Sequence, residues 1–321
     1  MENIIVKEIR SDPIYRKMLA SAPEARDDIY RYEFMQQFSE KWALYHIPLK
    51  AKQPGGYDIV MASGMMGYLL PQKLDEACSP QIDILSNDEL WHSCRKSVER
   101  SLGCFETSGI VLPVREYLLT LTLADPASPY SKLSDDYYGD GGIPGYIFGT
   151  LVPSKRTMSR LPVALAHESN HNVRFQFVKW SNDISLGEYM VAEGLAENFA
   201  GYLYGRENVG PWVTKTDAET LNEYIKPLLK EELSQRGFDN ITSYMYGDEI
   251  AKLREYLPVG MPYCAGYACG YHLVKYYLDK TGRSIMDATL LPAQEILDVA
   301  ADFWSLPTAG GEFEWRKQEK S

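Results

Sequence analysis

Two histidines four residues apart, His167 and His171, are the residues of this sequence best suited to bind a metal ion. On a helix this spacing places both imidazoles on one face, with their Cβ atoms about 5–6 Å apart. Two imidazoles at that separation can share one tetrahedral metal ion, and zinc is the usual occupant of such sites. Glu168 lies on the adjacent face and can reach a metal-bound water, which makes it the candidate general base of a hydrolytic reaction.

The pattern His-Glu-x-x-His fixes only three positions, and it also arises by chance on exposed helices that bind no metal. Here the pattern lies within an apolar segment, which favours a buried helix over about 158–179 and a dry wall around a metal ion. The apolar residues of that segment are Leu161, Val163, Leu165, Val173, Phe175 and Phe177. The metal-site interpretation is therefore favoured over a chance match.

A second acidic helix follows at short range and carries two glutamates four residues apart, Glu193 and Glu197. Two carboxylates among small apolar residues would be costly to bury unpaired. Glu193 as a third metal ligand, and Glu197 as the acceptor for a histidine ring N–H, would satisfy both. The alternative is a solvated acidic stripe, and Gly194 argues against it, because glycine inside a helix costs about 1 kcal/mol relative to alanine. Arg174 would pair with Glu197 or a substrate carboxylate, a structural salt bridge being the simpler role.

These motifs resemble those of the gluzincin metallopeptidases, and more narrowly those of the YjaZ-like family of predicted Zn-dependent proteases. The resemblance covers residues 102–298 and has three parts: HExxHxxR at 167–174, EGLAE at 193–197 and GYxxGY at 266–271. The ligand glutamate follows the second histidine by about 22 residues, slightly farther than in the best-known gluzincins, as expected for a longer loop between the two helices.

The resemblance implies one zinc ion (Zn2+) per chain, bound by His167, His171 and Glu193, with Glu168 as the general base. It also implies a zincin-like fold of two lobes. The first lobe would contain a mixed sheet and the metal-binding helix, and the second would be mainly helical.

The third motif contains two glycines four residues apart, Gly266 and Gly270, which make a flat helical face that another helix can approach closely. A peptidase of this class needs a hydrogen-bond donor aimed at the oxyanion of the tetrahedral intermediate. Tyr267 is our first candidate for that donor, followed by Tyr271 and then His272. The alternative is that these side chains only pack, as most tyrosines of this chain do.

The order of elements predicts how the chain positions these residues. Strand-like sequence precedes the metal-binding helix and mostly helical sequence follows it, which is typical of an α+β chain with a mixed sheet. We expect four segments: a helical or irregular region of unassigned role over 1–90, a mixed-sheet lobe over 91–183, a helical lobe over 184–304, and a tail over 305–321.

One strand is expected close to the metal-binding helix, over 145–152. Polar residues at 135–142 indicate a turn that leads into it, and Pro144 and Pro153 at its ends indicate a strand at the edge of the sheet. By the resemblance, this edge would pair with the backbone of an extended peptide. Its substrate-binding residues would be Gly145, Tyr146, Ile147, Phe148 and Gly149.

The composition argues against several classes of partner. The net charge of −11 over 321 residues disfavours nucleic acid, which needs concentrated Lys and Arg. Five cysteines without a Cys-x-x-Cys pair argue against a disulfide framework and against an all-cysteine zinc site. The first residues lack the apolar core of a signal peptide, and no apolar run reaches the ~18 residues that span a bilayer. We expect a cytoplasmic protein without a membrane partner, and the oligomeric state stays open.

The sequence thus predicts a zinc-dependent peptidase that acts on a peptide or protein substrate. One alternative is a zinc-binding regulatory or stress-associated protein that keeps a zincin fold and has little proteolytic activity. The complete motif with its glutamate base argues against that alternative, because a site that no longer catalyses tends to lose the base. A second alternative is a helical protein in which the motif is accidental, and zinc analysis would separate it from the other two.

Overall fold

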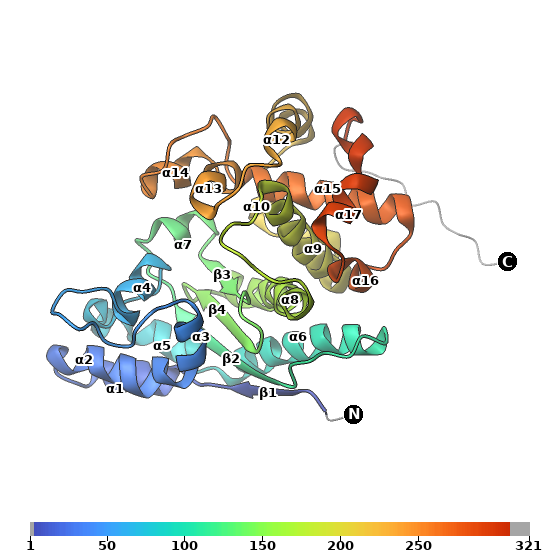
Figure 1. Cartoon of the computed structure of the whole chain (residues 1–321). Helices are drawn as coiled ribbons and strands as arrows, with labels where there is room; N and C mark the ends of the chain where they lie inside the picture. The colour runs from blue at the N-terminus through green and yellow to red at the C-terminus, as the bar shows by residue number, and fades with distance from the viewer. Residues whose placement is uncertain (1–2, 309–321) are drawn as a thin grey trace. The chain divides into compact units, whose positions relative to one another are not determined.

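The structure is a computed structural model that describes residues 3–308, shown in Figure 1. The chain divides into two compact units. The first contains the described residues up to Lys179 together with Phe199–Val209, and the second contains Trp180–Asn198 and the described residues from Gly210 onward. These bounds differ from the four expected segments, because the region before residue 90 shares a unit with the sheet. The predicted tail lies outside the described residues from 309 onward.

A four-stranded mixed sheet lies in the first unit, with the strand order β1-β2-β4-β3. Its strands are β1 (Ile5–Glu8), β2 (Glu116–Leu123), β3 (Tyr137–Asp140) and β4 (Tyr146–Leu151). Strands β1, β2 and β4 run parallel to one another, and β3 pairs antiparallel with β4. The predicted α+β class with a mixed sheet is confirmed.

Helices cover both faces of this sheet. On one face lie α8 (Lys155–Phe177) and α6 (Asp88–Thr107), which pack against each other, and Gly149 of β4 faces α8. On the other face, the rings of Phe38 and Trp42 pack against Phe148. The remaining α-helices of the unit are α1 (Asp12–Leu19), α2 (Pro23–Ile29), α3 (Ser39–Leu44), α4 (Ile59–Met65), α5 (Ser79–Leu85) and α7 (Pro129–Leu133). The region before residue 90 therefore supplies one strand and one helical layer.

The strand expected near the metal-binding helix is present as β4, but its predicted position at the sheet edge is wrong. β4 pairs with β2 on one side and with β3 on the other, so both of its edges are occupied. The sequence pattern predicts a turn where β3 forms, because Gly139 and Asp140 are disfavoured in strands. Pro144 and Pro153 lie just outside β4, where proline removes no hydrogen bond from the ladder. Of the two strands at the edges of the sheet in residues 3–308, β3 is the one that packs against α8.

The predicted metal-binding helix is α8, and its start is set by a capping box. The Ser154 hydroxyl accepts from the Thr157 backbone N–H at 3.1 Å, and the Thr157 hydroxyl accepts from the Ser154 N–H at 2.9 Å. This reciprocal pair satisfies two of the free N–H groups at a helix start. The helix continues through Pro162, whose carbonyl accepts a hydrogen bond from the Ser97 hydroxyl. The predicted helix over about 158–179 thus begins three residues earlier and ends at Phe177.

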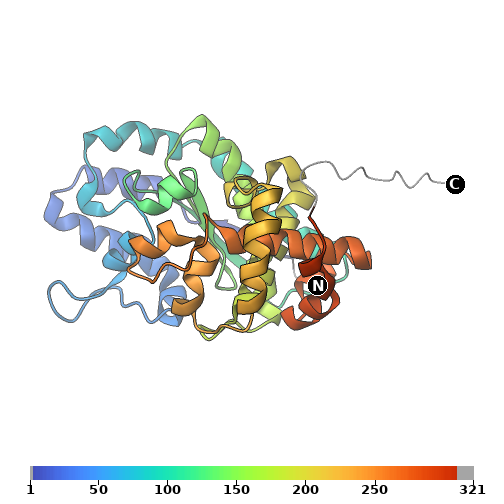
Figure 2. The same ribbon diagram turned by 90° about the horizontal axis from the view of Figure 1, so that it is seen from above.

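The second unit is helical around α15 (Ala265–Thr281), against which α10, α13 and α17 pack (Figure 2). Helix α9 (Leu186–Tyr204) begins in this unit, and its last turns, from Phe199, belong to the first. The other α-helices are α10 (Pro211–Thr214), α11 (Ala218–Thr220), α12 (Lys226–Glu232), α13 (Phe238–Tyr246), α14 (Asp248–Leu253), α16 (Ile285–Thr289) and α17 (Ala293–Val299). Short π-helical segments are Tyr30–Phe34 and Leu221–Ile225, and 3₁₀ segments are Met35–Phe38, Pro71–Lys73, Glu76–Cys78, Arg206–Asn208 and Ala301–Ser305.

The cysteines agree with the expectation drawn from their spacing. All five fall within the described residues and all five are free thiols, so no disulfide framework is present. Within residues 3–308, no helix combines the length and the apolar character needed to cross a membrane.

Candidate metal centre

His167 and His171 lie on one face of α8, as their spacing predicts, and both side chains are buried. Their Nε2 atoms are 3.0 Å apart. Two imidazole ligands of a tetrahedral zinc ion at Zn–N distances of about 2.0–2.1 Å would hold their nitrogen atoms about 3.3 Å apart. The two rings therefore already have nearly the separation that a shared metal ion requires.

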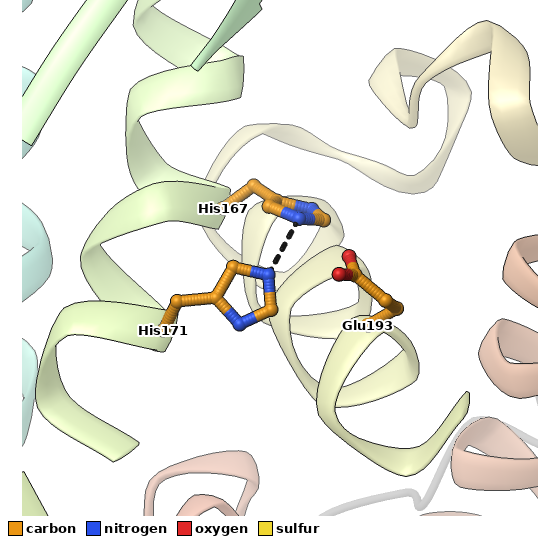
Figure 3. A group of neighbouring side chains, drawn as sticks. All are labelled: His167, His171 and Glu193. Carbon is orange, nitrogen blue, oxygen red and sulfur yellow. Dashed lines mark hydrogen bonds between the residues drawn. The ribbon is translucent and has the colours of Figure 1, made fainter. Parts of the chain in front are cut away.

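Glu193 of α9 completes a group of three potential ligands (Figure 3). One nitrogen from each histidine and one carboxylate oxygen lie within 4.8 Å of one another, and all three residues are buried. Among residues 3–308, this is the one group of three or more His, Cys, Asp or Glu side chains with that geometry. Two imidazoles and one carboxylate form a donor set of catalytic zinc sites, which keep a fourth position for water or substrate. The predicted ligands thus fit a zinc ion by chemistry and by spacing.

Glu168 projects from α8 toward β3 and is held there by the backbone. The Gly141 N–H donates to its Oε2 atom at 2.7 Å. Two glycines make this approach possible, because a Cβ at Gly139 would overlap the Glu168 side chain and a Cβ at Gly141 would overlap the Glu168 carbonyl oxygen. One carboxylate oxygen of the predicted base is therefore held by Gly141, the residue that follows β3, a strand that the sequence pattern did not reveal.

Glu197 lies one turn after Glu193 and is buried. Its two oxygens accept hydrogen bonds from the Gly210 N–H and from the indole N–H of Trp212, the latter at 2.7 Å. These bonds attach the start of α10 to α9 and explain why this carboxylate can be buried. The predicted bond from a histidine ring to Glu197 stays a prediction. Arg174 is buried one turn beyond His171, and its predicted ion pair with Glu197 also stays a prediction.

Three tyrosines of the second unit lie close to Glu193. The Tyr267 hydroxyl donates to the Tyr246 hydroxyl at 3.1 Å, and the Tyr189 and Tyr246 hydroxyls are 2.7 Å apart. Burial, and then the negative charge of Glu193, raises the pKa of Tyr246 to about 12. Burial and charges that include Glu193 raise the pKa of Tyr267 and Tyr189 well above the ordinary value. All three side chains are therefore protonated hydroxyl donors at neutral pH.

Sequence reasoning selected Tyr267 and missed Tyr246. Tyr246 is the last residue of α13, and it reaches Tyr267 and Tyr189 from a separate segment of the chain. No short motif surrounds it, so only the packing of α13 against α15 could have revealed it.

A family model described as "Predicted Zn-dependent protease (DUF2268)" matches residues 90–298, which is more than half of the chain. The matched stretch contains α8, α9 and α15, and with them all three motifs. The chain belongs to this family of predicted Zn-dependent proteases.

Two proteins of Bacillus subtilis (strain 168) are similar to this family member. "Uncharacterized protein YjfC" is 36% identical over 284 residues, which cover 88% of this chain and 94% of YjfC. "Uncharacterized protein YjaZ" is 28% identical over 136 residues, which cover 42% of this chain and 48% of YjaZ. The predicted resemblance to the YjaZ-like family is thereby confirmed. The similarity to YjfC is longer than the stretch from residue 90 to the end, so it includes part of the region before residue 90. No solved structure matches the chain.

The two remaining oxyanion candidates of this predicted Zn-dependent protease differ from Tyr267 in their surroundings. Tyr271 is buried in α15, and its ring lies edge-on to that of His272, with ring centroids 5.2 Å apart. Burial, and then the positive charges of Lys275 and Lys226, lowers the pKa of His272 to about 4. The charges that act on His272 are those of two lysines, whereas the charge that acts on Tyr267 is that of Glu193, a proposed metal ligand. The surroundings therefore favour Tyr267 over His272 as the donor.

The low pKa of His272 predicts that this residue contributes to the loss of folding stability at acidic pH. Because the folded state keeps His272 neutral while the unfolded chain protonates near pH 6.5, stability falls as the pH drops from about 6.5 to 4. A difference of about 2.5 pKa units corresponds to about 3 kcal/mol. The variant His272→Gln should lack this contribution, so urea denaturation should show a smaller loss between pH 7 and pH 4 than in the wild type. Equal losses in both proteins would mean that His272 titrates normally.

The predicted substrate-binding segment, Gly145–Gly149, leads into β4, whose two edges are both paired, and its contact with a substrate stays a prediction. The Gly145 N–H donates to the Asn172 side-chain oxygen at 2.8 Å, and the following residues are interior to the sheet in β4. The Asn172 amide also donates to the carbonyls of Gly141, Ile143 and Tyr146. Asn172 directly follows the metal-binding motif and was missed, because its partners lie in a loop whose path the sequence does not predict. This residue holds the segment between β3 and β4 against α8.

Proposed function

We propose that this chain is a zinc-dependent peptidase of the gluzincin type with a two-lobed zincin fold. The observation that carries the proposal is the joint placement of two imidazoles and one carboxylate around one point, with Glu168 next to them on α8. Membership of a family described as predicted Zn-dependent proteases supports the same conclusion.

In this mechanism His167, His171 and Glu193 would hold the metal ion. Bound zinc supplies a water of lowered pKa and a Lewis acid for the peptide carbonyl. Glu168 takes the proton from the attacking water and passes it to the leaving amine. The Gly141 N–H holds Oε2 of Glu168, so that Oε1 is the oxygen that accepts the proton. Tyr267 is the hydroxyl donor that we assign to the oxyanion.

We also assign the substrate strand to the outer edge of β3, in place of β4. Within residues 3–308, β3 pairs with β4 on one side and with no strand on the other. Gly139 of this strand and Gly141, which follows it, both lie against Glu168. An extended peptide that added to this edge by backbone pairing would therefore run past the proposed base.

The test is zinc analysis followed by digestion of a peptide library. We expect about one zinc per chain, as a catalytic site of this type requires, and cleavage of library peptides that a chelator abolishes and added zinc restores. The variants His171→Ala and Glu193→Ala should lose the zinc, whereas His92→Ala, a histidine on α6 outside the site, should keep it. Absence of zinc from the wild type would overturn the proposal. Zinc binding without cleavage would instead favour the regulatory alternative.

A further inference from the structure

Lys41, on α3, is a fully buried lysine that the proposed mechanism does not use. Its side chain is 0% exposed, and its ammonium group lies 2.7 Å from Oδ2 of Asp140, the last residue of β3. It also lies over the rings of Trp42, Tyr45 and Phe148. Burying an ammonium group is costly unless a partner compensates, and removing one member of such a pair leaves an uncompensated charge. The ion pair with Asp140 is therefore what makes this lysine compatible with the core.

Strand β3 contacts Lys41 on one face of the sheet and Glu168 on the other. Successive residues of a strand point to opposite faces of the sheet. Asp140 points to the face covered by α3, where it meets Lys41. Gly139 points to the face covered by α8, where a Cβ would overlap the Glu168 side chain. A shift of β3 on one face therefore moves the surface that Glu168 packs against on the other.

The residues after β3 are fixed from both faces in the same way. Oδ1 of Asp140 accepts from the Gly142 N–H at 3.1 Å, and Oδ2 of the same carboxylate binds Lys41. On the α8 side, the Asn172 amide donates to the Gly141 carbonyl at 3.0 Å. Between these two attachments, the Gly141 N–H donates to Glu168. The direction of that N–H therefore depends on the Asp140 carboxylate, which Lys41 holds.

Tyr45, which follows α3, lies at the same position. A Cβ at Gly142 would come 3.2 Å from the Tyr45 hydroxyl. The region before residue 90 thus brings two polar groups, one ammonium and one hydroxyl, to the segment that orients the proposed base.

We propose that Lys41 is a positioning residue for Glu168, acting through Asp140 and the Gly141 N–H. The proposal rests on the proposed function, in which Glu168 is the general base. Lys41 touches neither the metal ligands nor the reacting groups in this assignment. Its charge holds the Asp140 carboxylate, the carboxylate holds the residues after β3, and their backbone holds one oxygen of Glu168. This gives the region before residue 90 a catalytic task, although the matched family stretch begins at residue 90.

The test compares Lys41→Met with wild type in zinc content, kcat and KM. A misplacement of about 1 Å caused by a mutation far from the reacting atoms can cost about 10²-fold, so we expect a decrease of up to that size in kcat, with little change in KM and unchanged zinc per chain. Lys41→Arg, which keeps the charge, should retain more activity than Lys41→Met. Asp140→Asn should reproduce the loss, and combining it with Lys41→Met should add little, because both act through the same bond.

The matched control is Lys226→Met. Lys226 is a buried lysine of the second unit that donates to the Leu306 carbonyl at 2.6 Å. Its removal should lower stability but leave kcat unchanged, which separates a positioning role from the general cost of removing a buried lysine. If Lys41→Met does not fold, the double variant Lys41→Met/Asp140→Asn carries the same test, because it removes both charges of the pair and leaves neither of them uncompensated.

The outcomes separate this inference from the proposed function. A Lys41→Met protein with wild-type kcat, beside an inactive Glu168→Gln protein, would overturn the inference and leave the peptidase intact. If zinc-loaded wild type cleaves nothing, the proposed function fails, and the positioning is then decided by hydrogen exchange of the Gly141 amide. Faster exchange over 139–142 in Lys41→Met, and not in Lys226→Met, would support it, whereas equal exchange would overturn it.

Discussion

The variant Glu168→Gln is expected to bind zinc as the wild type does and to lose about 10²- to 10⁴-fold in kcat, the range over which a general base contributes. The amide of glutamine has nearly the size of the carboxylate, and its oxygen can still accept the hydrogen bond from Gly141. The orientation of the side chain is therefore kept while its ability to take a proton is lost. Steady-state hydrolysis of a library-derived peptide, with zinc measured on the same samples, checks this expectation.

The control for this experiment is Glu89→Gln, which changes a glutamate in the first turn of α6 outside the site. It makes the same chemical change and should leave both kcat and zinc content unaltered. Full activity in Glu168→Gln would reject Glu168 as the base. Loss of zinc in the same variant would show a ligand in place of a base, because an amide is a poorer ligand than a carboxylate for Zn²⁺.

The parts of the site that local spacing determines were predictable from the sequence. Four-residue intervals place His167 beside His171 on α8 and Glu193 beside Glu197 on α9. Each interval is one helical turn, so the relation holds wherever the helix forms. Gly194 was also informative, because a glycine inside a helix indicates close packing. A Cβ at this position would overlap the backbone of α15.

The parts of the site that depend on strand pairing were not predictable. β3 has four residues, two of which are a glycine and an aspartate, and its pairing with β4 makes it a strand. Strand preferences are weak and depend on neighbours that are distant in sequence, so the pattern at 135–142 indicates a turn equally well. A sequence pattern that does not reveal β3 predicts β4 at the edge of the sheet, and it does not identify Gly141 as the partner of Glu168.

The side chains that reach the site from distant segments were missed for a related reason. Lys41, Asn172 and Tyr246 belong to no motif, and each acquires its place through tertiary packing. A buried lysine such as Lys41 resembles any surface lysine in a sequence, since only its partner Asp140 distinguishes it. The proposed catalytic motif could thus be located from the sequence, whereas the groups that orient it could be found only from the fold.

Replacing Gly194 by alanine is expected to destabilise the second unit by about 3 kcal/mol, the upper part of the usual range for overpacking a core. A Cβ at Gly194 would overlap the Gly270 carbonyl of α15, and a Cβ at Gly270 would overlap the Met190 carbonyl of α9. The two helices therefore approach through reciprocal glycines, backbone against backbone, and neither obstacle is a flexible side chain. Urea denaturation with fluorescence detection should show a lower midpoint for Gly194→Ala. Its affinity for zinc should also fall, because Glu193 is the adjacent residue.

The matched control is Gly103→Ala in α6. Gly103 is also inside a helix, but a Cβ there would meet no atom within 4 Å. With no clash, the higher helix propensity of alanine should stabilise the protein by up to about 1 kcal/mol. The two substitutions are chemically identical and are expected to have opposite signs, so the difference isolates the close approach of α9 and α15. If both variants were stabilised alike, the helices would have room to separate, and the position of Glu193 would not depend on the glycines beside it.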